Sequence, residues 1–176
     1  MKIRTISRSE IEQIKKINRS EIVDKIYYLD SGQLKLKNEF YNIKCWKPNE
    51  LEKDIEHLYK IYDSGGYILG CFEGDKLVGV AGLDSEFIGK NREYLQLYFL
   101  HVDSKYRRTG IGKKLLKKVS FLAKKLMAKK LYISATPSQN TVDFYLNLGC
   151  QLVLELNPTL YQLEPKDIHL ELSLSD

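Results

Sequence analysis

The stretch that decides the fold is LHVDSKYRRTGIG, residues 100–112, which passes from an apolar, strand-like run into a loop with two glycines. Gly110 and Gly112 let the backbone approach a ligand closely, and the helix expected from Ile111 onward begins with amides that have no partner inside the helix. The dipole of that helix favours negative charge at this end. A pyrophosphate would fit such a loop, although a two-glycine loop taken alone also fits a plain turn.

The clearest helix in the sequence follows this loop. Its apolar residues recur at helical spacing on one face: Ile111, Leu115, Leu116, Val119, Leu122, Ala123, Leu126 and Met127. Eight lysines fall between Lys113 and Lys130, and the plain interpretation of such a run is a solvated helix face. The loop matches neither the GxxxxGK[ST] pattern nor the dinucleotide-binding GxGxxG pattern.

Strands are expected before the loop. Three runs rich in β-branched and aromatic residues lie at Tyr67–Glu73, Lys76–Leu83 and Tyr94–Val102. Gly74-Asp75 makes a tight turn between the first two, and a looser turn at Gly89–Arg92 precedes the third. The pattern predicts an antiparallel meander of three strands.

Four further elements are expected after the long helix: a buried strand at Leu131–Ala135, a short helix at Val142–Leu148, and strands at Gln151–Leu156 and Ile168–Leu174. Asn157–Pro165 is expected as the loop between the last two strands.

The N-terminal part is expected to contain several short elements: a strand at Met1–Ile6, a helix at Ser9–Asn18, a second helical segment through Ile22, Val23, Ile26 and Leu29, an exposed strand at Leu34–Lys37 with Phe40–Trp46 as its partner, and a helix from Pro48 to the Ser64-Gly65-Gly66 stop. Ser7 and Glu10 have the spacing of a capping box for the first helix.

Length and composition limit the classes of protein. The 176 residues fit a single domain over 1–176, and the 43% hydrophobic and 29% charged residues are ordinary values for a globular chain. No apolar run is long enough for a membrane span and the polar N-terminus does not look like a signal peptide, so we expect a cytoplasmic protein. Three separated cysteines and three scattered histidines predict neither a disulfide framework nor a metal site. The net charge of +5 alone is weak support for a nucleic-acid partner, and none is expected.

Two motifs on either side of the long helix resemble one family. Leu100-His101-Val102 followed by the R-x-x-G-x-G run at Arg107–Gly112 looks like motif A of the GNAT N-acetyltransferases, and Phe144-Tyr145 with Gly149-Cys150 looks like the FYxxxGF segment of that family. The resemblance is strong over Tyr67–Leu156 and rests on topology elsewhere. It implies an α/β fold, with a largely antiparallel sheet of about seven strands flanked by helices, and acetyl-CoA as the cosubstrate.

The resemblance also implies where acetyl-CoA binds. In this family the third meander strand and the strand after the long helix splay apart, and the pantetheine arm enters between them while the pyrophosphate takes the amides of Arg108–Lys113. The implied cofactor-binding residues are Leu100, His101, Val102, Arg107, Arg108, Thr109, Gly110, Ile111, Gly112, Lys113, Asn140 and Tyr145. Because the family position for an asparagine is Ser138 here, the contact is assigned to Asn140, the nearest asparagine, and Ser138 can be a helix cap.

Catalysis is expected to involve two tyrosines. Tyr145 matches the family tyrosine that faces the sulfur of CoA, which makes it the candidate acid. Where many family members carry a glutamate base, this chain has Tyr98, and a neutral phenol is a poor base at pH 7, so Tyr98 is expected to orient water or substrate. Glu86 is the first candidate for the base, with Asp84 and His101 as alternatives.

The expected reaction is transfer of an acetyl group from acetyl-CoA to a primary amine, with a small molecule as the favoured acceptor. A protein N-terminus or lysine is the alternative acceptor, and a non-catalytic acyl-CoA-binding module is the alternative class. Substrate choice is expected to lie in Glu21–Trp46, where aromatic and acidic residues could hold a cationic amine or form a hydrophobic flap. A homodimer is also possible.

Overall fold

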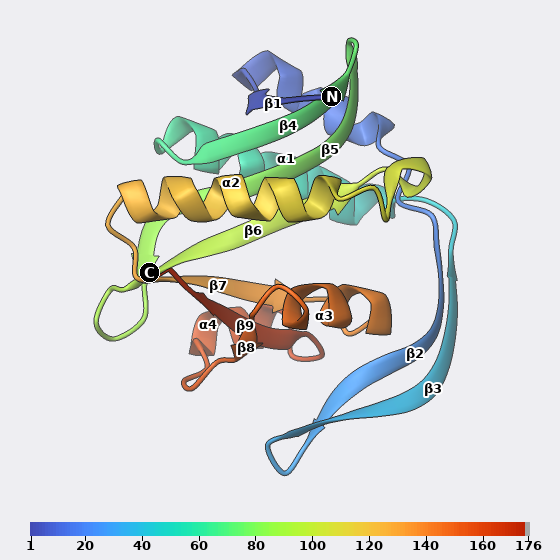
Figure 1. The fold of residues 1–176 in the computed structure, drawn as a ribbon, viewed down its shortest axis with the longest axis vertical. Coiled ribbons are helices and arrows are strands. Elements are labelled where there is room, and N and C mark those ends of the chain that lie inside the picture. Colours follow the sequence, from blue (N-terminus) through green and yellow to red (C-terminus); the bar gives the residue numbers. More distant parts are fainter. Residues whose placement is uncertain (175–176) are drawn as a thin grey trace.

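Seven strands form one sheet in the order β1-β4-β5-β6-β7-β9-β8, as the computed structural model shows (Figure 1). The structure describes residues 1–174, and residues 175 and 176, the end of the expected domain, lie outside it. The strands of this sheet are β1 (Lys2–Thr5), β4 (Tyr67–Glu73), β5 (Lys76–Ile88), β6 (Tyr94–Val102), β7 (Lys130–Ala135), β8 (Gln151–Leu152) and β9 (Ile168–Ser173). Among the strands of residues 1–174, the pairing of β6 with β7 is the only parallel one. The predicted meander and the largely antiparallel sheet of about seven strands are confirmed.

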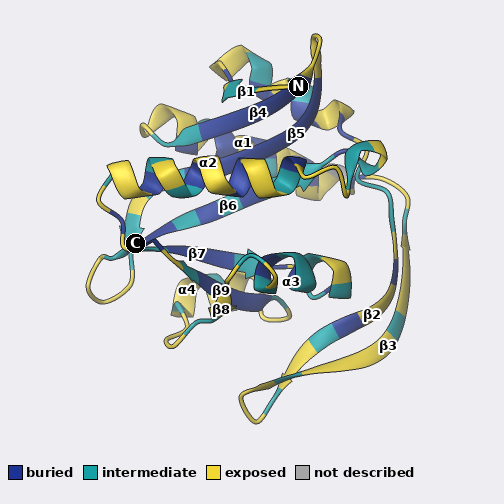
Figure 2. Ribbon diagram, in the orientation of Figure 1, coloured by how far each residue is buried: buried dark blue, intermediate teal, exposed yellow. Residues whose placement is uncertain are grey.

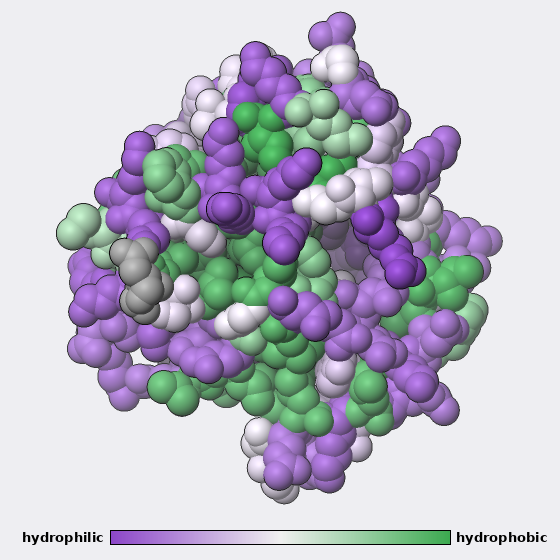
Figure 3. Space-filling view, in the orientation of Figure 1, coloured by the Kyte–Doolittle hydropathy of each residue, from purple (hydrophilic) through white to green (hydrophobic). Residues whose placement is uncertain are grey.

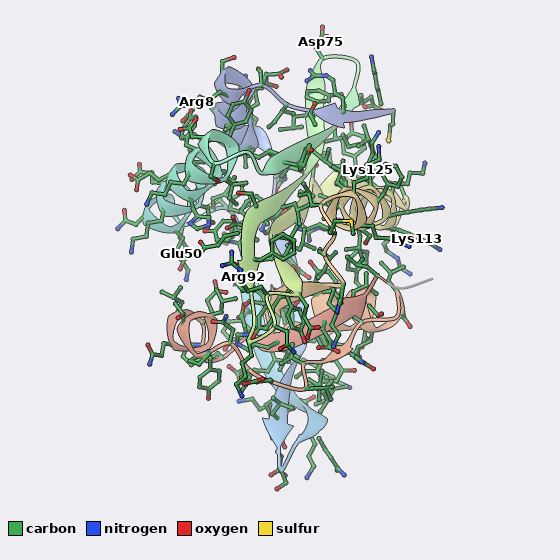
Figure 4. The ribbon with its side chains drawn as sticks, turned by 90° about the vertical axis from the view of Figure 1, so that its left-hand side faces the viewer. Arg8, Glu50, Asp75, Arg92, Lys113 and Lys125 are labelled. Carbon is green, nitrogen blue, oxygen red and sulfur yellow. The ribbon has the colours of Figure 1, made fainter. Side chains whose placement is uncertain are left out.

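Helices cover both faces of the sheet. The helical elements are η1 (Arg8–Lys16), α1 (Pro48–Asp63), η2 (Ser104–Tyr106), α2 (Ile111–Lys125), α3 (Gln139–Leu146) and α4 (Pro158–Leu163). The apolar sides of η1 and α1 pack on one face in a cluster that includes Ile11, Leu58 and Phe99. The apolar sides of α2 and α3 pack on the other face. Figure 4 shows α4 on the same side of the sheet as α1, with α2 on the opposite side.

A separate two-stranded ribbon, β2 (Glu21–Asp30) with β3 (Gln33–Ile43), projects beside α3 (Figure 1). The predicted second helix through Ile22–Leu29 is therefore wrong. Its helix-like spacing has a physical cause: the register shifts between Val23 and Lys25, which breaks the alternation of a strand and leaves Val23 and Ile26 as the buried residues of β2. The ribbon is mostly exposed (Figure 2).

Several other boundaries differ from the sequence expectation. The two expected short strands at Leu34–Lys37 and Phe40–Trp46 are replaced by the single strand β3, whose partner is β2 across the Asp30-Ser31-Gly32 turn. The first helix is a 3-10 helix, and its capping box is present, with the Ser7 amide donating to Glu10 at 2.8 Å. The strand predicted at Gln151–Leu156 keeps only two residues, and the expected loop contains α4. In the described part of the chain, no helix has the length and apolarity that a membrane span requires.

Candidate active site

β6 and β7 lie side by side at one end and then separate. Tyr94–Gln96 pairs with Lys130–Tyr132, and among the described residues the pairing goes no further. Beyond Gln96, β6 keeps β5 on its other edge, while the edge that faces β7 carries backbone N–H and C=O groups without a strand partner. An extended molecule with amide groups can take the place of the missing strand. Figure 3 shows the surface hollowed between the start of α2 and α3, in front of this separation.

A buried ionic cluster holds the joined end of the two strands. The Glu171 carboxylate of β9, 1% exposed, accepts hydrogen bonds from Tyr94 Oη at 2.6 Å and Lys130 Nζ at 3.0 Å. Burial alone would raise the pKa of Glu171, but these bonds and one from Gln151 outweigh it and hold the pKa below its usual value. Because Tyr94 and Lys130 are register partners, the cluster holds the two strands together at their joined end, two residues before the pairing stops at Gln96.

A bulge in β6 lies just beyond Gln96. Gly82 pairs with Phe99 and Leu83 pairs with Leu97, so Tyr98 is the extra residue of β6. A bulge changes the direction in which a side chain points, and here the Phe99 side chain joins the apolar cluster under α1 while Leu97 belongs to the cluster under α2. Tyr98 packs on the α1 side.

The loop before α2 has the backbone of an anion-binding turn. Gly110 has φ +86° at the N-cap and Arg108 has φ +63°, both in the left-handed region. The first bond of the helix is from the Lys114 amide to the Gly110 carbonyl, at 3.0 Å, so the amides of Ile111–Lys113 precede it. A Cβ built on Gly110 would meet no atom within 4 Å, which leaves open space above the loop. The residues present therefore fit a pyrophosphate.

Gly112 has a different role from the one that its sequence suggests. A Cβ at this position would lie 3.1 Å from two ring carbons of Phe144. The absence of a side chain at Gly112 thus allows the start of α2 to pack closely against Phe144 of α3.

The Arg107 side chain is engaged with the protein itself. Its Nη1 donates to the Ser20 carbonyl and its Nη2 to the Arg19 carbonyl, both at 3.0 Å, and its Nε reaches the Val102 carbonyl at 3.3 Å. The chain at Arg19 and Ser20 leads into β2, so Arg107 holds the entry of the ribbon beside the end of β6. Thr109 donates to the Tyr106 carbonyl at 2.6 Å and closes the loop.

The three residues at the end of β6 point to both faces. Leu100 and Val102 pack against the apolar cluster under α2. The His101 ring lies on the opposite face, 4.7 Å from the Trp46 ring and 4.4 Å from the Phe99 ring, centroid to centroid. Burial, with a smaller contribution from nearby arginines, lowers the pKa of His101 to about 3. A histidine this weakly basic is a poor proton acceptor at pH 7.

Tyr145 lies on the buried side of α3 and is 6% exposed. Burial raises the pKa of its phenol, with a smaller contribution from Cys150, so it keeps its proton at neutral pH and can act as a donor. Ser138 is the N-cap of α3 and accepts from the Thr141 amide. Asn140, which the sequence predicts to bind the cofactor, donates from Nδ2 to Glu21 of β2 at 3.3 Å. Its side chain is therefore bonded to the ribbon.

The ribbon also contacts α3 through Tyr27. Its hydroxyl donates to Asp143 at 2.7 Å, and its amide donates to the Pro137 carbonyl, also at 2.7 Å. β2 therefore crosses from the end of β6 to the start of α3, over the wide end of the separation. Whether Glu21–Trp46 selects the acceptor stays a prediction.

The two acidic candidates for the base lie on β5. Asp84 accepts from the Ser85 and Glu86 amides and has His57 Nε2 at 3.6 Å. Burial works against its ionisation, but His57 and the two amides outweigh burial and lower the pKa of Asp84. Asp84 is therefore a weak base. Glu86 is exposed on the irregular part of β5 that faces β6, on the side away from the separation.

A carboxylate that the sequence does not single out contacts the extra residue of the bulge. The Tyr98 hydroxyl donates to Asp54 Oδ1 of α1 at 2.9 Å, and the His57 ring stacks on the Tyr98 ring at 4.0 Å. Burial is the largest influence on Asp54 and raises its pKa. From the sequence, Asp54 looks like any acidic residue on the polar side of α1, and only the long-range pairing with β6 identifies it.

Two further carboxyls come from the end of α4. Glu164 is the C-cap of α4, and Asp167 lies beyond it. Burial and the neighbouring Glu164 raise the pKa of Asp167 to about 7, and Glu164 also interacts electrostatically with Asp54. Acidic groups from α1 and α4 thus gather on the face of the sheet opposite α2.

Comparisons with known proteins agree with this geometry. Residues 34–150 match the model of the acetyltransferase (GNAT) family. Nourseothricin acetyltransferase has a similar structure, with a TM-score of 0.73 and 15% identity over 99% of this chain and 98% of that chain. A putative streptothricin acetyltransferase from Bacillus anthracis str. Ames, solved in complex with acetyl coenzyme A, has a TM-score of 0.72 and 19% identity over 98% and 97% of the two chains. Aminoglycoside 6'-acetyltransferase type Ii has a TM-score of 0.67 and 15% identity over 100% and 99%. A comparison with curated protein sequences found no match.

Proposed function

Because the chain belongs to the acetyltransferase (GNAT) family, we propose that it transfers an acetyl group from acetyl-CoA to a primary amine of a small molecule. The observation that carries the proposal is the separation of β6 from β7 directly beside the glycine loop of α2. The loop offers amides to a pyrophosphate, and the free edge of β6 offers N–H and C=O groups to the amides of a pantetheine arm.

The direction of the pantetheine arm follows from this arrangement. The loop lies just past Val102, at the wide end of the separation, so an arm that follows β6 from the loop ends near the bulge at Tyr98. The thioester would then lie between Tyr98 on one side and α3, with Tyr145, on the other. Leu100, His101 and Val102 would contribute the strand edge, and Arg108–Lys113 the amides.

Tyr145 is suited to protonate the leaving sulfur. A thiol has a pKa near 8.5, so its thiolate is a moderately good leaving group and a correctly placed acid adds about 10²–10⁴ in rate. The phenol of Tyr145 is protonated at neutral pH and buried on the side of α3 that faces the sheet. We assign it the acid role.

The acceptor amine presents the larger obstacle. An alkylamine with a pKa near 10.4 is neutral in about one molecule in 10^3.4 at pH 7, which corresponds to roughly 4–5 kcal/mol. The carboxyls of Asp54, Glu164 and Asp167 would favour a cationic acceptor on the α1 side of the sheet. Three structural neighbours are named for acetylation of nourseothricin, streptothricin and an aminoglycoside, which supports a small acceptor.

Thiol release in the presence of acetyl-CoA and a panel of amines tests the proposal. The panel should contain aminoglycosides, streptothricin-type compounds, linear polyamines, and peptides with a free N-terminus or lysine. Turnover with a small amine but not with peptides is the expected result. Turnover with peptides alone would favour the alternative acceptor. Calorimetric acetyl-CoA binding without turnover on any amine would indicate a non-catalytic binding module.

A further inference from the structure

The hydrogen bond from Tyr98 to Asp54 connects the bulge of β6 to α1. The donor is the phenol oxygen and the acceptor is Asp54 Oδ1, 2.9 Å away. The His57 ring, stacked on the Tyr98 ring at 4.0 Å, fixes the plane of the phenol. A phenol oxygen that donates its hydrogen keeps lone pairs free to accept one from another group.

The position of this pair relative to the thioester rests on the proposed function. Tyr98 is two residues past Gln96, the last residue of β6 that pairs with β7. It is also the extra residue of the bulge, so its backbone and side chain lie where the pantetheine arm would end. An amine that attacks the thioester from the α1 side would approach the Tyr98 oxygen.

Each member of the pair needs the other. Burial, followed by the neighbouring Asp54, raises the pKa of Tyr98, so its phenol does not act as an anionic base. Asp54 has a raised pKa, chiefly from burial, which makes its carboxylate a better proton acceptor than an exposed one. The phenol lies between the carboxylate and the amine and can receive one proton as it gives up another.

The titratable and charged groups that act on Asp54 come from several elements. They are Glu50 and His57 of α1, Arg19 after η1, Tyr98 of β6 and Glu164 at the end of α4. Glu50 raises the pKa of Asp54, while the Tyr98 hydrogen bond, Arg19 and His57 stabilise its charged form. Asp54 raises the pKa of Glu164. Glu164 in turn lies beside Asp167.

We propose that Tyr98 and Asp54 form a proton relay that deprotonates the acceptor ammonium. The N–H bond of the ammonium breaks as its proton moves to the Tyr98 oxygen, and the original phenol proton moves to Asp54 Oδ1. The phenol ends neutral, the carboxylate ends as a carboxylic acid, and the amine is left with the lone pair that attacks the thioester. Tyr98 contacts the amine, and Asp54 acts through Tyr98.

Three variants test the relay. Asp54→Asn keeps a group that accepts from Tyr98 but cannot take its proton, and Tyr98→Phe keeps the ring that stacks on His57. Glu56→Gln is the matched control, because Glu56 is an exposed carboxylate of the same helix. At saturating amine and pH 7, kcat should fall about 10²-fold in Asp54→Asn and in Tyr98→Phe and stay unchanged in Glu56→Gln.

The pH profile separates the relay from a structural role. In both relay variants kcat should rise up to tenfold per pH unit between about 7 and 9, because only neutral amine reacts, while wild-type kcat stays nearly flat. Equal calorimetric affinity for acetyl-CoA and equal melting temperatures would show that the variants are folded and loaded. An Asp54→Asn enzyme with the wild-type kcat and pH profile would overturn the relay alone. A wild type that acetylates no amine would overturn the proposed function and the relay together.

A second readout does not depend on turnover. Carbon-detected NMR titration of the Asp54 carboxyl should give a higher pKa in Tyr98→Phe than in wild type, because the hydrogen bond that stabilises the carboxylate is gone. The same Asp54 pKa in both proteins would contradict the coupling on which the relay depends.

Discussion

Arg107 Nη1 donates a 3.0 Å hydrogen bond to the Ser20 carbonyl, and this contact ties the loop before α2 to the start of the β2–β3 ribbon. Arg107 Nη2 makes the equivalent bond to the Arg19 carbonyl. The side chain of Arg107 therefore supports the start of the ribbon. The backbone amides of Ile111–Lys113, which come before the first hydrogen bond of α2, are a separate feature of the same loop.

Arg107→Ala should destabilise the protein and weaken acceptor binding. A buried hydrogen bond from a charged group contributes about 1.5–3 kcal/mol, and solvent screening of this partly exposed side chain reduces its contribution. Chemical denaturation should show a loss of about 1–2 kcal/mol. Arg108→Ala, which removes an exposed arginine next to it, serves as the control and should change stability little.

Gly110→Val should abolish or strongly weaken acetyl-CoA binding in a folded protein. The φ of +86° is strained for any residue with a Cβ, by about 1–3 kcal/mol, and a relaxed loop would no longer direct its amides to the pyrophosphate. Gly32→Val is the matched control, because Gly32 also has positive φ and open space around it, but lies at the tip of the ribbon. If calorimetry gives both variants the same acetyl-CoA affinity as wild type, the loop at Gly110 is not part of the acetyl-CoA binding site.

Tyr145→Phe should lower kcat by about 10–10³-fold at every pH from 6 to 9, with little change in acetyl-CoA affinity, since the lost proton donor acts mainly in the transition state. The absence of recovery at high pH distinguishes it from the relay variants. Tyr94→Phe, another buried tyrosine, is the control and should affect stability more than kcat. Unaltered steady-state rates for Tyr145→Phe across this range would make Tyr145 a packing residue.

Glu171→Gln should lower the free energy of unfolding at neutral pH, because it weakens the joined end of β6 and β7. The loss should be smaller at low pH. The folded-state pKa of Glu171 lies below its unfolded value, so its contribution is complete above about pH 4.5 and is lost as pH falls through the folded-state pKa. Urea denaturation at pH 7 should show a loss of about 1–3 kcal/mol. The difference between variant and wild type should shrink below pH 4, and a difference that stays constant with pH would contradict this role.

The sequence predicts the meander, α2 and the loop at Gly110 because each depends on local pattern: alternation, helical periodicity and glycine in a turn. It misplaces Ile22–Leu29 because the irregularity after Val23 imitates helical spacing within a strand. It does not single out Asp54 because the feature that does so, the hydrogen bond from Tyr98, joins residues that are remote in sequence. Local rules describe elements well, whereas the contacts of Asp54 with Tyr98 and Glu164 join α1, β6 and the end of α4, which are far apart in sequence.

Other expectations from the sequence stay predictions. The cytoplasmic location and the homodimer are among them, as are the individual roles of the residues expected to bind the cofactor. Asn140 is one of these residues, and its side chain donates a hydrogen bond to Glu21 of the ribbon. Acetyl-CoA titrations of Asn140→Ala would show whether it contributes to affinity.

Mass spectrometry of the reaction products tests the central claim most directly. Wild-type protein, acetyl-CoA and a small cationic amine should yield an acceptor that carries one added acetyl group on nitrogen, with one CoA thiol released for each product molecule. Acetyl-CoA that binds at the loop of α2 but leaves every amine and peptide unmodified, with no thiol release above the protein-free rate, would contradict the account.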